Sequence, residues 1–358
     1  MLHRWSFLLT FLLLCILHPL AAQDLEKAAE GLNKLGGKKP ALPGQLYEPQ
    51  RIGRPLAFDD WVSSACWLDD SQFALGSFDE LRLYTADGKL VKKIKHDAGP
   101  VKALCYERNS KKLFAGCHQR ILVIDPETYK VISKWKGHRG EVNDLTLSAD
   151  STQLISISND QTIRIWDLAS GSQIHVIEKM DQPGYSIDIS PDGKLLAIGL
   201  GDESSSTAPG LVQLWSFETR EKIADLTPHK KQTTVVRFTH DGAKLLTGSI
   251  DERIHVYDVA THKALGYFAG HPRPVNDLII LNDNDTVISA SGGQYKKLFE
   301  FKIWRISEGE ALGSVEPHED AVVAIALSPD EKTLVTASHD KTAVIFSLKD
   351  MPISDANR

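Results

Sequence analysis

The sequence contains little cysteine, which argues against a fold held by disulfides. Only 4 of its 358 residues are cysteine, and no CxxC or CxxCH motif occurs. Cys15 lies in an N-terminal apolar stretch, so Cys66, Cys105 and Cys117 remain, far apart in the rest of the chain. An odd number of distant cysteines does not form a disulfide framework. We therefore expect these three to be small buried hydrophobic residues.

Two of these cysteines fall on adjacent strands of one expected hairpin. Pairing Tyr106 with Leu113 places Cys105 opposite Phe114. Cys105 and Cys117 are then not cross-strand neighbours, because antiparallel partners have residue numbers with a constant sum. This register predicts that both thiols stay free.

The chain has no excess of positive charge and no basic run. It carries 41 Lys and Arg against 47 Asp and Glu, a formal net charge of -6. A mildly acidic protein lacks the electrostatic surface that binds nucleic acids or anionic membranes. Neither class of partner is favoured, and the protein is expected to be a monomer.

Motifs that bind metals are missing as well. None of the 13 histidines forms an HxH or HExxH motif. The run Asn282-Asp283-Asn284-Asp285 resembles the start of a calcium loop, but the Gly at loop position 6 and the Glu at position 12 are missing. This run lies where a hairpin turn is expected. The sequence therefore predicts no metal and no cofactor.

The longest hydrophobic run is at the N-terminus, where residues 1–22 are typical of a secretory signal peptide. His3 and Arg4 precede an apolar stretch from Trp5 to Leu17, and small residues lead to Ala22. A helix of that length spans roughly 20 Å, which is shorter than a ~30 Å hydrocarbon core. We expect cleavage near Ala22 and export to the periplasm or cell exterior, with an uncleaved anchor as the weaker alternative. Residues 23–44 are expected to form a linker.

The chain does contain one unit that is repeated seven times between Phe58 and Ser347. Its clearest copy starts with Gly137-His138 and ends with Ile163-Arg164-Ile165-Trp166-Asp167. The position of Trp166 recurs at Tyr84, Ile124, Trp215, Tyr257, Trp304 and Phe346, with intervals of 40, 42, 49, 42, 47 and 42 residues. A period of this length with four short strands per unit predicts a radial array of sheets, because one unit cannot bury its own hydrophobic faces.

These units resemble the WD40 family and cover everything except the two ends. The resemblance implies an all-β fold, a seven-bladed WD40-type β-propeller over residues 45–350, with four antiparallel strands per blade and a C-terminal tail at 351–358. In the third unit, alternation and turn residues place strands at 142–147, 154–158, 162–167 and 173–177. Propellers of this family usually close the ring with an N-terminal strand, and residues 45–58 are expected to pair with the strand that holds Phe346.

A Ser-His-Asp set in the third unit could be mistaken for a hydrolytic triad. These residues resemble the buried tetrad of the family, with Trp166 as its fourth member. The expected tetrads are His138, Ser158, Asp160 and Trp166; His229, Ser249, Asp251 and Tyr257; and His318, Ser338, Asp340 and Phe346. An active site occurs once in a chain, whereas this group recurs. We therefore expect a structural role and no catalytic residues. The second unit departs from the pattern, with Cys117 and Gln119 in place of Ser and Asp.

Two units are longer than the others, with insertions at 201–209 and 292–297. In the WD40 family such loops emerge on one face, as does the residue before each tetrad aspartate. The resemblance therefore implies a partner-binding face, although surface loops also tolerate insertion without any function. The residues expected there are Phe78, His118, Arg139, Asn159, Ile250, Arg273, Tyr295, Lys296, Lys297 and His339.

The first functional hypothesis is a non-enzymatic, exported scaffold that binds a protein or peptide partner. A purely structural envelope component is not distinguished from it by the sequence. The alternative of a different class is a secreted propeller enzyme or small-molecule sensor that uses the central channel. Its polar candidates on inner strands are Asn143, Asp144, Asn276 and Asp277, and alternation is expected to turn only one residue of each adjacent pair inward.

Overall fold

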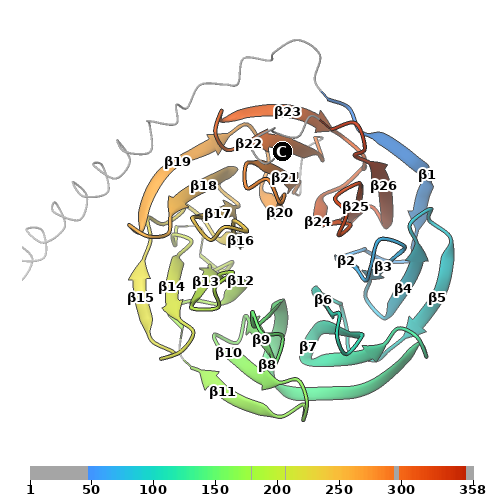
Figure 1. The fold of residues 1–358 in the computed structure, drawn as a ribbon, viewed down its shortest axis with the longest axis horizontal. Helices are drawn as coiled ribbons and strands as arrows, with labels where there is room; N and C mark the ends of the chain where they lie inside the picture. The colour runs from blue at the N-terminus through green and yellow to red at the C-terminus, as the bar shows by residue number, and fades with distance from the viewer. Residues whose placement is uncertain (1–46, 179, 206, 294–297, 352–358) are drawn as a thin grey trace, which may run out of the picture.

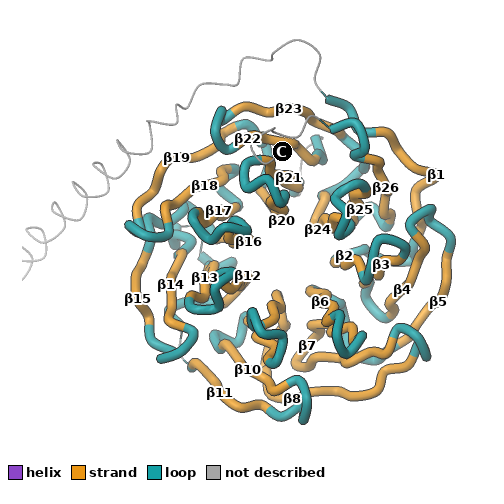
Figure 2. Tube along the Cα trace, in the orientation of Figure 1, coloured by secondary structure: helices purple, strands orange, loops and turns teal. Residues whose placement is uncertain are grey.

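The computed structural model describes residues 47–351 except 179, 206 and 294–297. The expected signal peptide, the linker and the tail beyond Met351 lie outside the described residues. Within the described part, the regular elements are all strands, connected by turns and loops around a ring (Figure 2). This part of the chain holds no helix with the length and apolar character needed to span a bilayer.

The strands form an all-β propeller of six sheets arranged in a ring (Figure 1). The prediction of seven separate four-stranded blades is wrong, because the second and third repeats share one six-stranded sheet. The connecting element is β8 (Lys130–Leu147), which pairs with β7 (Lys112–Asp125) through its first half and with β9 (Gln153–Ser158) through its second half.

The reason for this continuity lies in the second repeat, where Gln119 takes the place of the tetrad aspartate. The side-chain amide of Gln119 donates to the carbonyl of Arg139 at 3.0 Å, and His118 pairs with Glu141. These contacts keep the link between the two repeats extended, so no break separates their strands. The remaining strands of this sheet are β6 (Ala103–Glu107), β10 (Ile163–Asp167) and β11 (Gln173–Ile177).

The other five sheets have four antiparallel strands each. The first contains β2 (Ser64–Trp67), β3 (Gln72–Gly76), β4 (Glu80–Thr85) and β5 (Leu90–Lys95). The next two contain β12 (Gly184–Ile189), β13 (Leu195–Leu200), β14 (Val212–Ser216) and β15 (Lys222–Asp225), and β16 (Thr233–Phe238), β17 (Lys244–Ser249), β18 (Arg253–Asp258) and β19 (Lys263–Ala269). The last two contain β20 (Val275–Ile280), β21 (Thr286–Ser291), β22 (Phe301–Arg305) and β23 (Glu310–Val315), and β24 (Val322–Leu327), β25 (Thr333–Ser338), β26 (Thr342–Ser347) and β1 (Gln50–Ala57). Their innermost strands, nearest the centre of the ring, are β2, β12, β16, β20 and β24 (Figure 1).

The ring is closed by β1, which forms the outer strand of the last sheet beside β26 (Figure 1). Arg51 lies opposite Phe346, and Leu56 lies opposite Ala343. The prediction that the N-terminal segment pairs with the strand holding Phe346 is confirmed. This pairing satisfies the backbone groups on the outer side of β26, which would otherwise be left as an open sheet edge.

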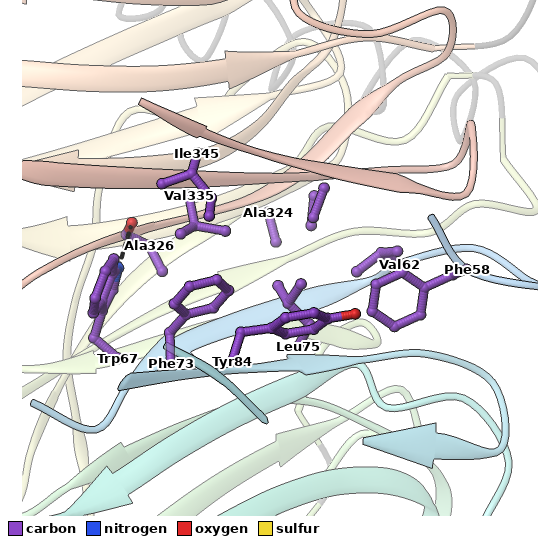
Figure 3. Close-up of a cluster of buried hydrophobic side chains, with 12 residues drawn as sticks. Phe58, Val62, Trp67, Phe73, Leu75, Tyr84, Ala324, Ala326, Val335 and Ile345 are labelled. Atoms are coloured by element: carbon purple, nitrogen blue, oxygen red, sulfur yellow. Dashed lines mark hydrogen bonds between the residues drawn. The ribbon is translucent and has the colours of Figure 1, made fainter. Parts of the chain in front are cut away.

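Next to this closure, the first and last sheets meet in an apolar seam (Figure 3). Phe73 and Leu75 are fully buried there against Val335. The indole Nε1 of Trp67 donates to the carbonyl of Ala326 at 3.1 Å, which joins the two sheets directly. Burying one such side chain stabilises a fold by about 1.5–3 kcal/mol, so the seam supplies much of the attraction that keeps the ring closed.

The outer strands share a β-bulge that protects their free edges. In each of β5, β8, β11, β15, β19 and β23, the register shifts beside the repeated aromatic or aliphatic position of the neighbouring strand. Four bulge residues are large, exposed aliphatic side chains: Ile132, Ile174, Ile223 and Leu265. A bulge twists an edge away from the geometry that another strand could extend, so these edges resist aggregation in spite of their apolar residues.

The predicted hairpin register around the cysteines is confirmed. Tyr106 lies opposite Leu113, and Cys105 lies opposite Phe114. Cys66, Cys105 and Cys117 are all free thiols; Cys117 is buried, whereas Cys66 and Cys105 are half-buried. Burial raises the pKa of Cys66 to about 12 and that of Cys117 to about 12, so both thiols are uncharged and unreactive at neutral pH.

Removing residues 45–57 is expected to lower the melting temperature by at least about 5 °C, because a domain of this size loses about 2–4 °C per kcal/mol. The deletion exposes the edge of β26 and removes the packing of Ile52 and Leu56 against the seam. Differential scanning fluorimetry measures the change. Arg54→Ala, an exposed substitution in the same strand, should leave the melting temperature unchanged. A deletion variant that melts with the wild type would show that β1 does not close the ring.

Candidate functional site

The expected tetrad of the third repeat exists, but its hydroxyl group belongs to Ser156. His138 Nε2 lies 2.7 Å from Ser156 Oγ, and His138 Nδ1 lies 3.0 Å from Asp160 Oδ2. Trp166 Nε1 donates to Ser156 Oγ at 2.9 Å. Ser158 instead accepts a hydrogen bond from the backbone N–H of Asp160. Residues 156 and 158 point to the same face of β9, so the sequence pattern alone did not distinguish them.

The fifth and seventh repeats show the same shift of two residues. His229 bonds to Thr247 at 2.7 Å, and His318 bonds to Thr336 at 2.8 Å. Ser249 and Ser338, which the sequence placed in these tetrads, donate to backbone carbonyls instead. Of the repeated aromatics, Tyr257 donates to the carbonyl of Thr227, while Phe346 packs edge-on against Phe301. The acids, Asp251 and Asp340, are placed as expected beside their histidines.

A fourth tetrad in the sixth repeat was missed. His271 bonds to Glu300 at 3.0 Å and to Ser289 at 2.6 Å, and Trp304 Nε1 donates to Ser289 at 2.7 Å. Its acid is a glutamate that follows the second insertion, so the spacing rule did not find it. The signal that was available is the pair of His271 and Trp304 at their repeated positions.

All four groups are buried, and this burial governs their ionisation. Burial by itself would raise the pKa of Asp160, but the hydrogen bond and charge of His138 outweigh it and hold that pKa well below its usual range. The pKa of Asp340 is lowered in the same way by His318. Burial also lowers the pKa of His138. These four buried copies of one arrangement hold neighbouring strands together, and a substrate cannot reach any of them.

One cluster of potential metal ligands occurs among the described residues: His229, Asp251 and His255, whose ligand atoms lie within 4.8 Å of one another. The two imidazole rings are stacked, with centroids 3.9 Å apart and planes 19° apart. Their in-plane lone pairs therefore lie in two nearly parallel planes and do not converge on one ion. Both nitrogens of His229 already bond to Asp251 and Thr247. We assign this cluster to the core of its sheet.

The central channel forms a cavity of about 780 Å³ lined by the inner strands. Both members of the pairs Asn143-Asp144 and Asn276-Asp277 line it. The expectation that only one of each turns inward is wrong, because the strand register shifts at Asn143 and at Asn276 and interrupts the alternation. The amide of Asn143 donates to the carbonyl of Gly184 at 2.7 Å, and that of Asn276 donates to Val322 at 2.8 Å. Each asparagine thus connects its own sheet to the next one.

Three aspartates form a second layer of bonds between sheets. Asp144 accepts from the N–H of Ile187 at 3.1 Å, Asp188 from Phe238 at 2.8 Å, and Asp277 from Ile325 at 3.0 Å. Arg237 lies among them, 3.1 Å from Asp144 and 3.7 Å from Asp277. Burial raises the pKa of Asp188 to about 6 and that of Asp277 to about 6, with Arg237 opposing the rise. These carboxylates are engaged in holding the ring together.

The structure places several predicted binding residues at one mouth of the channel. Asn159 and His339 line the cavity together with Glu141 and Lys102, and His118 lies 3.8 Å from Glu141. The other residues of the predicted face divide by exposure. Phe78, His118, Arg139 and Asn159 are exposed, Ile250, Arg273 and His339 are half-buried, and Tyr295, Lys296 and Lys297 lie outside the described residues.

The first insertion reaches the same mouth. Glu203 in this loop lines the cavity beside Tyr185. Burial, assisted by the charge and hydrogen bond of Glu203, raises the pKa of the Tyr185 hydroxyl above its usual value. Asp202 accepts hydrogen bonds from the backbone and side chain of Ser204, which gives the loop a defined turn. The expectation that this insertion belongs to the face of the channel mouth agrees with this placement.

An exposed aromatic residue at this mouth, Trp61, was missed by the sequence analysis. Trp61 is 54% exposed, and its indole packs against the imidazole of His339 in a tilted arrangement, with ring centroids 4.7 Å apart and planes 30° apart. The carbonyl of Trp61 accepts a hydrogen bond from the hydroxyl of Ser77 at 2.8 Å. Phe78, which follows Ser77 in the chain, is 52% exposed. We call Trp61, Phe78 and His339 the aromatic patch. Trp61 lies outside the repeated motif positions, so no pattern pointed to it.

The reassigned tetrad predicts different effects for two buried serines of β9. Ser156→Ala is expected to cost about 2–4 kcal/mol of unfolding free energy, because it leaves the buried Nε2 of His138 and Nε1 of Trp166 without a hydrogen-bond partner. Ser158→Ala removes a hydroxyl from an equally buried position and should cost about 1 kcal/mol. Urea unfolding of both variants measures the difference. A larger cost at Ser158 would restore the original assignment.

The channel aspartates predict a pH dependence with a defined sign. The folded state raises the pKa of Asp188 to about 6, above the unfolded value of about 3.9, so the contribution of this group is most favourable below pH 4 and is lost as the pH rises through 6. Asp188→Asn stays neutral. Its stability relative to the wild type should therefore improve between pH 4 and pH 7 in urea unfolding. The matched change is Asp192→Asn, in a turn where hydrogen bonds from the Ser190 hydroxyl and the Lys194 N–H lower the acid's pKa; its relative stability should shift in the opposite direction. A constant difference for Asp188→Asn would contradict the assigned environment.

Comparison with known proteins agrees with this architecture. Residues 129–167, 220–258 and 309–347 match the model of the WD domain, G-beta repeat. The chain is 25% identical over 235 residues to Periodic tryptophan protein 2 homolog of Dictyostelium discoideum, covering 64% of this chain and 24% of the relative. It is 24% identical over 250 residues to p21-activated protein kinase-interacting protein 1-like of Danio rerio, covering 68% and 64%. It is 25% identical over 244 residues to Echinoderm microtubule-associated protein-like 2 of Rattus norvegicus, covering 66% and 36%.

In each of these comparisons the chain spans less than two thirds of the relative's length. The matched segments end at Asp167, Asp258 and Ser347, next to the repeated positions of Trp166, Tyr257 and Phe346. The period of the repeats, the His-centred tetrads and the ring of sheets agree with these matches: the chain carries WD40 repeats, three of which match the family model.

Proposed function

We propose that this chain is a non-enzymatic scaffold that binds a protein partner at the channel mouth through the aromatic patch. The observation that carries the proposal is the exposure of two large aromatic side chains, Trp61 and Phe78, on a rigid part of the ring. Tryptophan is enriched among the residues that contribute most of the binding energy in protein interfaces, where the partner buries it. The proposed face also includes His118 and Asn159, which the sequence had placed there.

The backbone around Trp61 is firmly held. Its N–H donates to Asp60 at 2.7 Å, and the next N–H, that of Val62, donates to Ser338 at 3.1 Å. The side chain of Val62 is fully buried in the seam (Figure 3). A side chain that is already positioned loses little conformational entropy when a partner binds, so the patch is suited to recognition.

The polar residues of the channel give less support to the catalytic alternative. Catalysis there would need acids or histidines that converge on a substrate and are free to exchange protons. Asp144, Asp188 and Asp277 each accept a backbone N–H of the adjacent sheet, and Asn143 and Asn276 donate to carbonyls there. Their geometry serves the ring, and this favours a scaffold over an enzyme or sensor.

The relatives supply a second line of support. One is named as interacting with a protein kinase and another as associated with microtubules, so their names describe association with other macromolecules. Binding to a protein is accordingly the expectation for this chain. Export to the periplasm or cell exterior, which residues 1–22 predict, is part of the proposal.

The double substitution of Trp61 and Phe78 to alanine is expected to abolish capture of the partner. The full chain, tagged at its C-terminus, is crosslinked in its native cells and purified separately from cytoplasmic, envelope and external fractions. Mass spectrometry identifies bound proteins and the first residue of the purified chain. Ile174→Ala is the matched control, since Ile174 is 51% exposed on an outer strand.

A partner that is bound by the wild type and the Ile174 variant, but lost from the double variant, supports the proposal. Equal capture by all three chains would exclude the aromatic patch. No specific partner in any fraction would contradict the scaffold function itself. A chain found only in the cytoplasmic fraction with Met1 intact would contradict export.

A further inference from the structure

The exposed apolar residues of this protein fall into two kinds. Most are single aliphatic side chains on the outer strands, where the bulges account for them. Trp61 and Phe78 are the aromatic ones among the described residues. The hydroxyl of Ser77, the residue before Phe78, donates to the carbonyl of Trp61 at 2.8 Å, which ties the two exposed segments to each other. Their chemistry should therefore indicate what the partner presents.

The charges around the aromatic patch are mainly negative. Asp60 accepts a hydrogen bond from the N–H of Trp61, Asp59 precedes Asp60, Asp79 follows Phe78, and the charge of Asp320 acts on His339. The ammonium groups near the patch are those of Lys102, whose charge also acts on His339, and Lys341, which bonds to the backbone of Asp59. The side chain of Asp59 is 97% exposed, and Asp79, directly after Phe78, is exposed as well. The ammonium group of Lys102 also forms an ion pair with Glu141 at 3.6 Å, so it neutralises less of the negative charge of the patch. The local field thus favours a cation over an anion.

The other basic groups nearby offset only part of this charge. Arg82 forms a buried ion pair with Glu80 beneath the patch and also lies 3.6 Å from Asp59, so it balances part of the charge of these acids. Its guanidinium lies over the ring of Phe58 at 4.0 Å. Burial lowers the pKa of His339, so this imidazole is neutral at neutral pH and adds stacking surface without positive charge. Lys341 donates to the backbone carbonyl of Asp59 at 3.1 Å, which holds its charge at the border of the patch.

Exposed aromatic faces surrounded by carboxylates attract one kind of protein side chain. A lysine or arginine can lay its aliphatic stem on an indole, place its charge over the ring, and reach an adjacent carboxylate. We propose that the aromatic patch binds a basic side chain, arginine or lysine, of the protein partner. This inference rests on the proposed function and specifies the group that the partner inserts.

The direct test uses a short fluorescein-labelled peptide in which arginine and glycine alternate, together with a peptide of the same length in which citrulline replaces arginine. Citrulline has the same shape but no charge. Fluorescence anisotropy with the purified full chain should show saturable binding of the arginine peptide, with a dissociation constant of about 0.1–1 mM. The citrulline peptide should bind at least about tenfold more weakly.

The variants separate specific recognition from general attraction to an acidic protein. Trp61→Ala should weaken binding of the arginine peptide about tenfold or more, and Asp59→Asn combined with Asp79→Asn should also weaken it. Ile174→Ala and the charge-matched pair Asp87→Asn with Asp192→Asn, both away from the patch, should have no effect. Thermal unfolding of each variant shows whether it is folded.

The outcomes are distinguishable from a failure of the proposed function. If the citrulline peptide binds as well as the arginine peptide, or the remote pair weakens binding as much as Asp59 and Asp79, the inference is wrong. Absence of saturable binding below about 5 mM would also overturn it. If capture of the native partner still depends on Trp61 in that case, the scaffold function stands and the partner inserts a group of another chemistry.

Discussion

The pairing of β1 with β26 is the constraint on which the rest of the structure depends. Every sheet buries its faces against two neighbours, so no sheet is stable unless the ring is complete. The same pairing also positions the proposed binding site. After β1 the chain crosses from the last sheet to the first, held by bonds from Phe58 to Lys341 and from Val62 to Ser338. Trp61 lies within this crossing, so closure of the ring and exposure of its indole have one cause.

The polar interior of the channel follows from the same constraint. Sheets that meet at a narrow axis leave inner-strand backbone groups that have no partner within their own sheet. Asparagine and aspartate side chains satisfy them by reaching across to the adjacent sheet, with Arg237 balancing part of the charge. Burial raises the pKa of Asp188 and of Asp277, because it disfavours their charged forms. The hydrogen bonds that these side chains make to the adjacent sheets offset this unfavourable burial. Perturbed acids in this channel are therefore explained by architecture, although such acids often indicate active sites.

Much of the fold could be predicted from the sequence, and the failures have physical reasons. The repeated positions of Trp166 and its equivalents, the turn residues and the closing strand were found because period and turn chemistry are local properties. The sequence analysis assigned the tetrad hydroxyl to Ser158 instead of Ser156, because alternate residues of a strand share one face. The number of sheets was wrong because the continuity of β8 depends on contacts of Gln119 between repeats. Trp61 was missed because its exposure is decided by the seam between distant sheets.

The central claim is that a partner docks on the aromatic patch at the closure of the ring. Site-specific photo-crosslinking in native cells tests it most directly, with a photoreactive aromatic residue in place of Phe78 in one chain, where Trp61 stays intact, and in place of Ile174 in another. The account predicts a discrete crosslinked product from position 78 and none from the outer strand. A product from position 174 alone, or the same products from both positions, would contradict it.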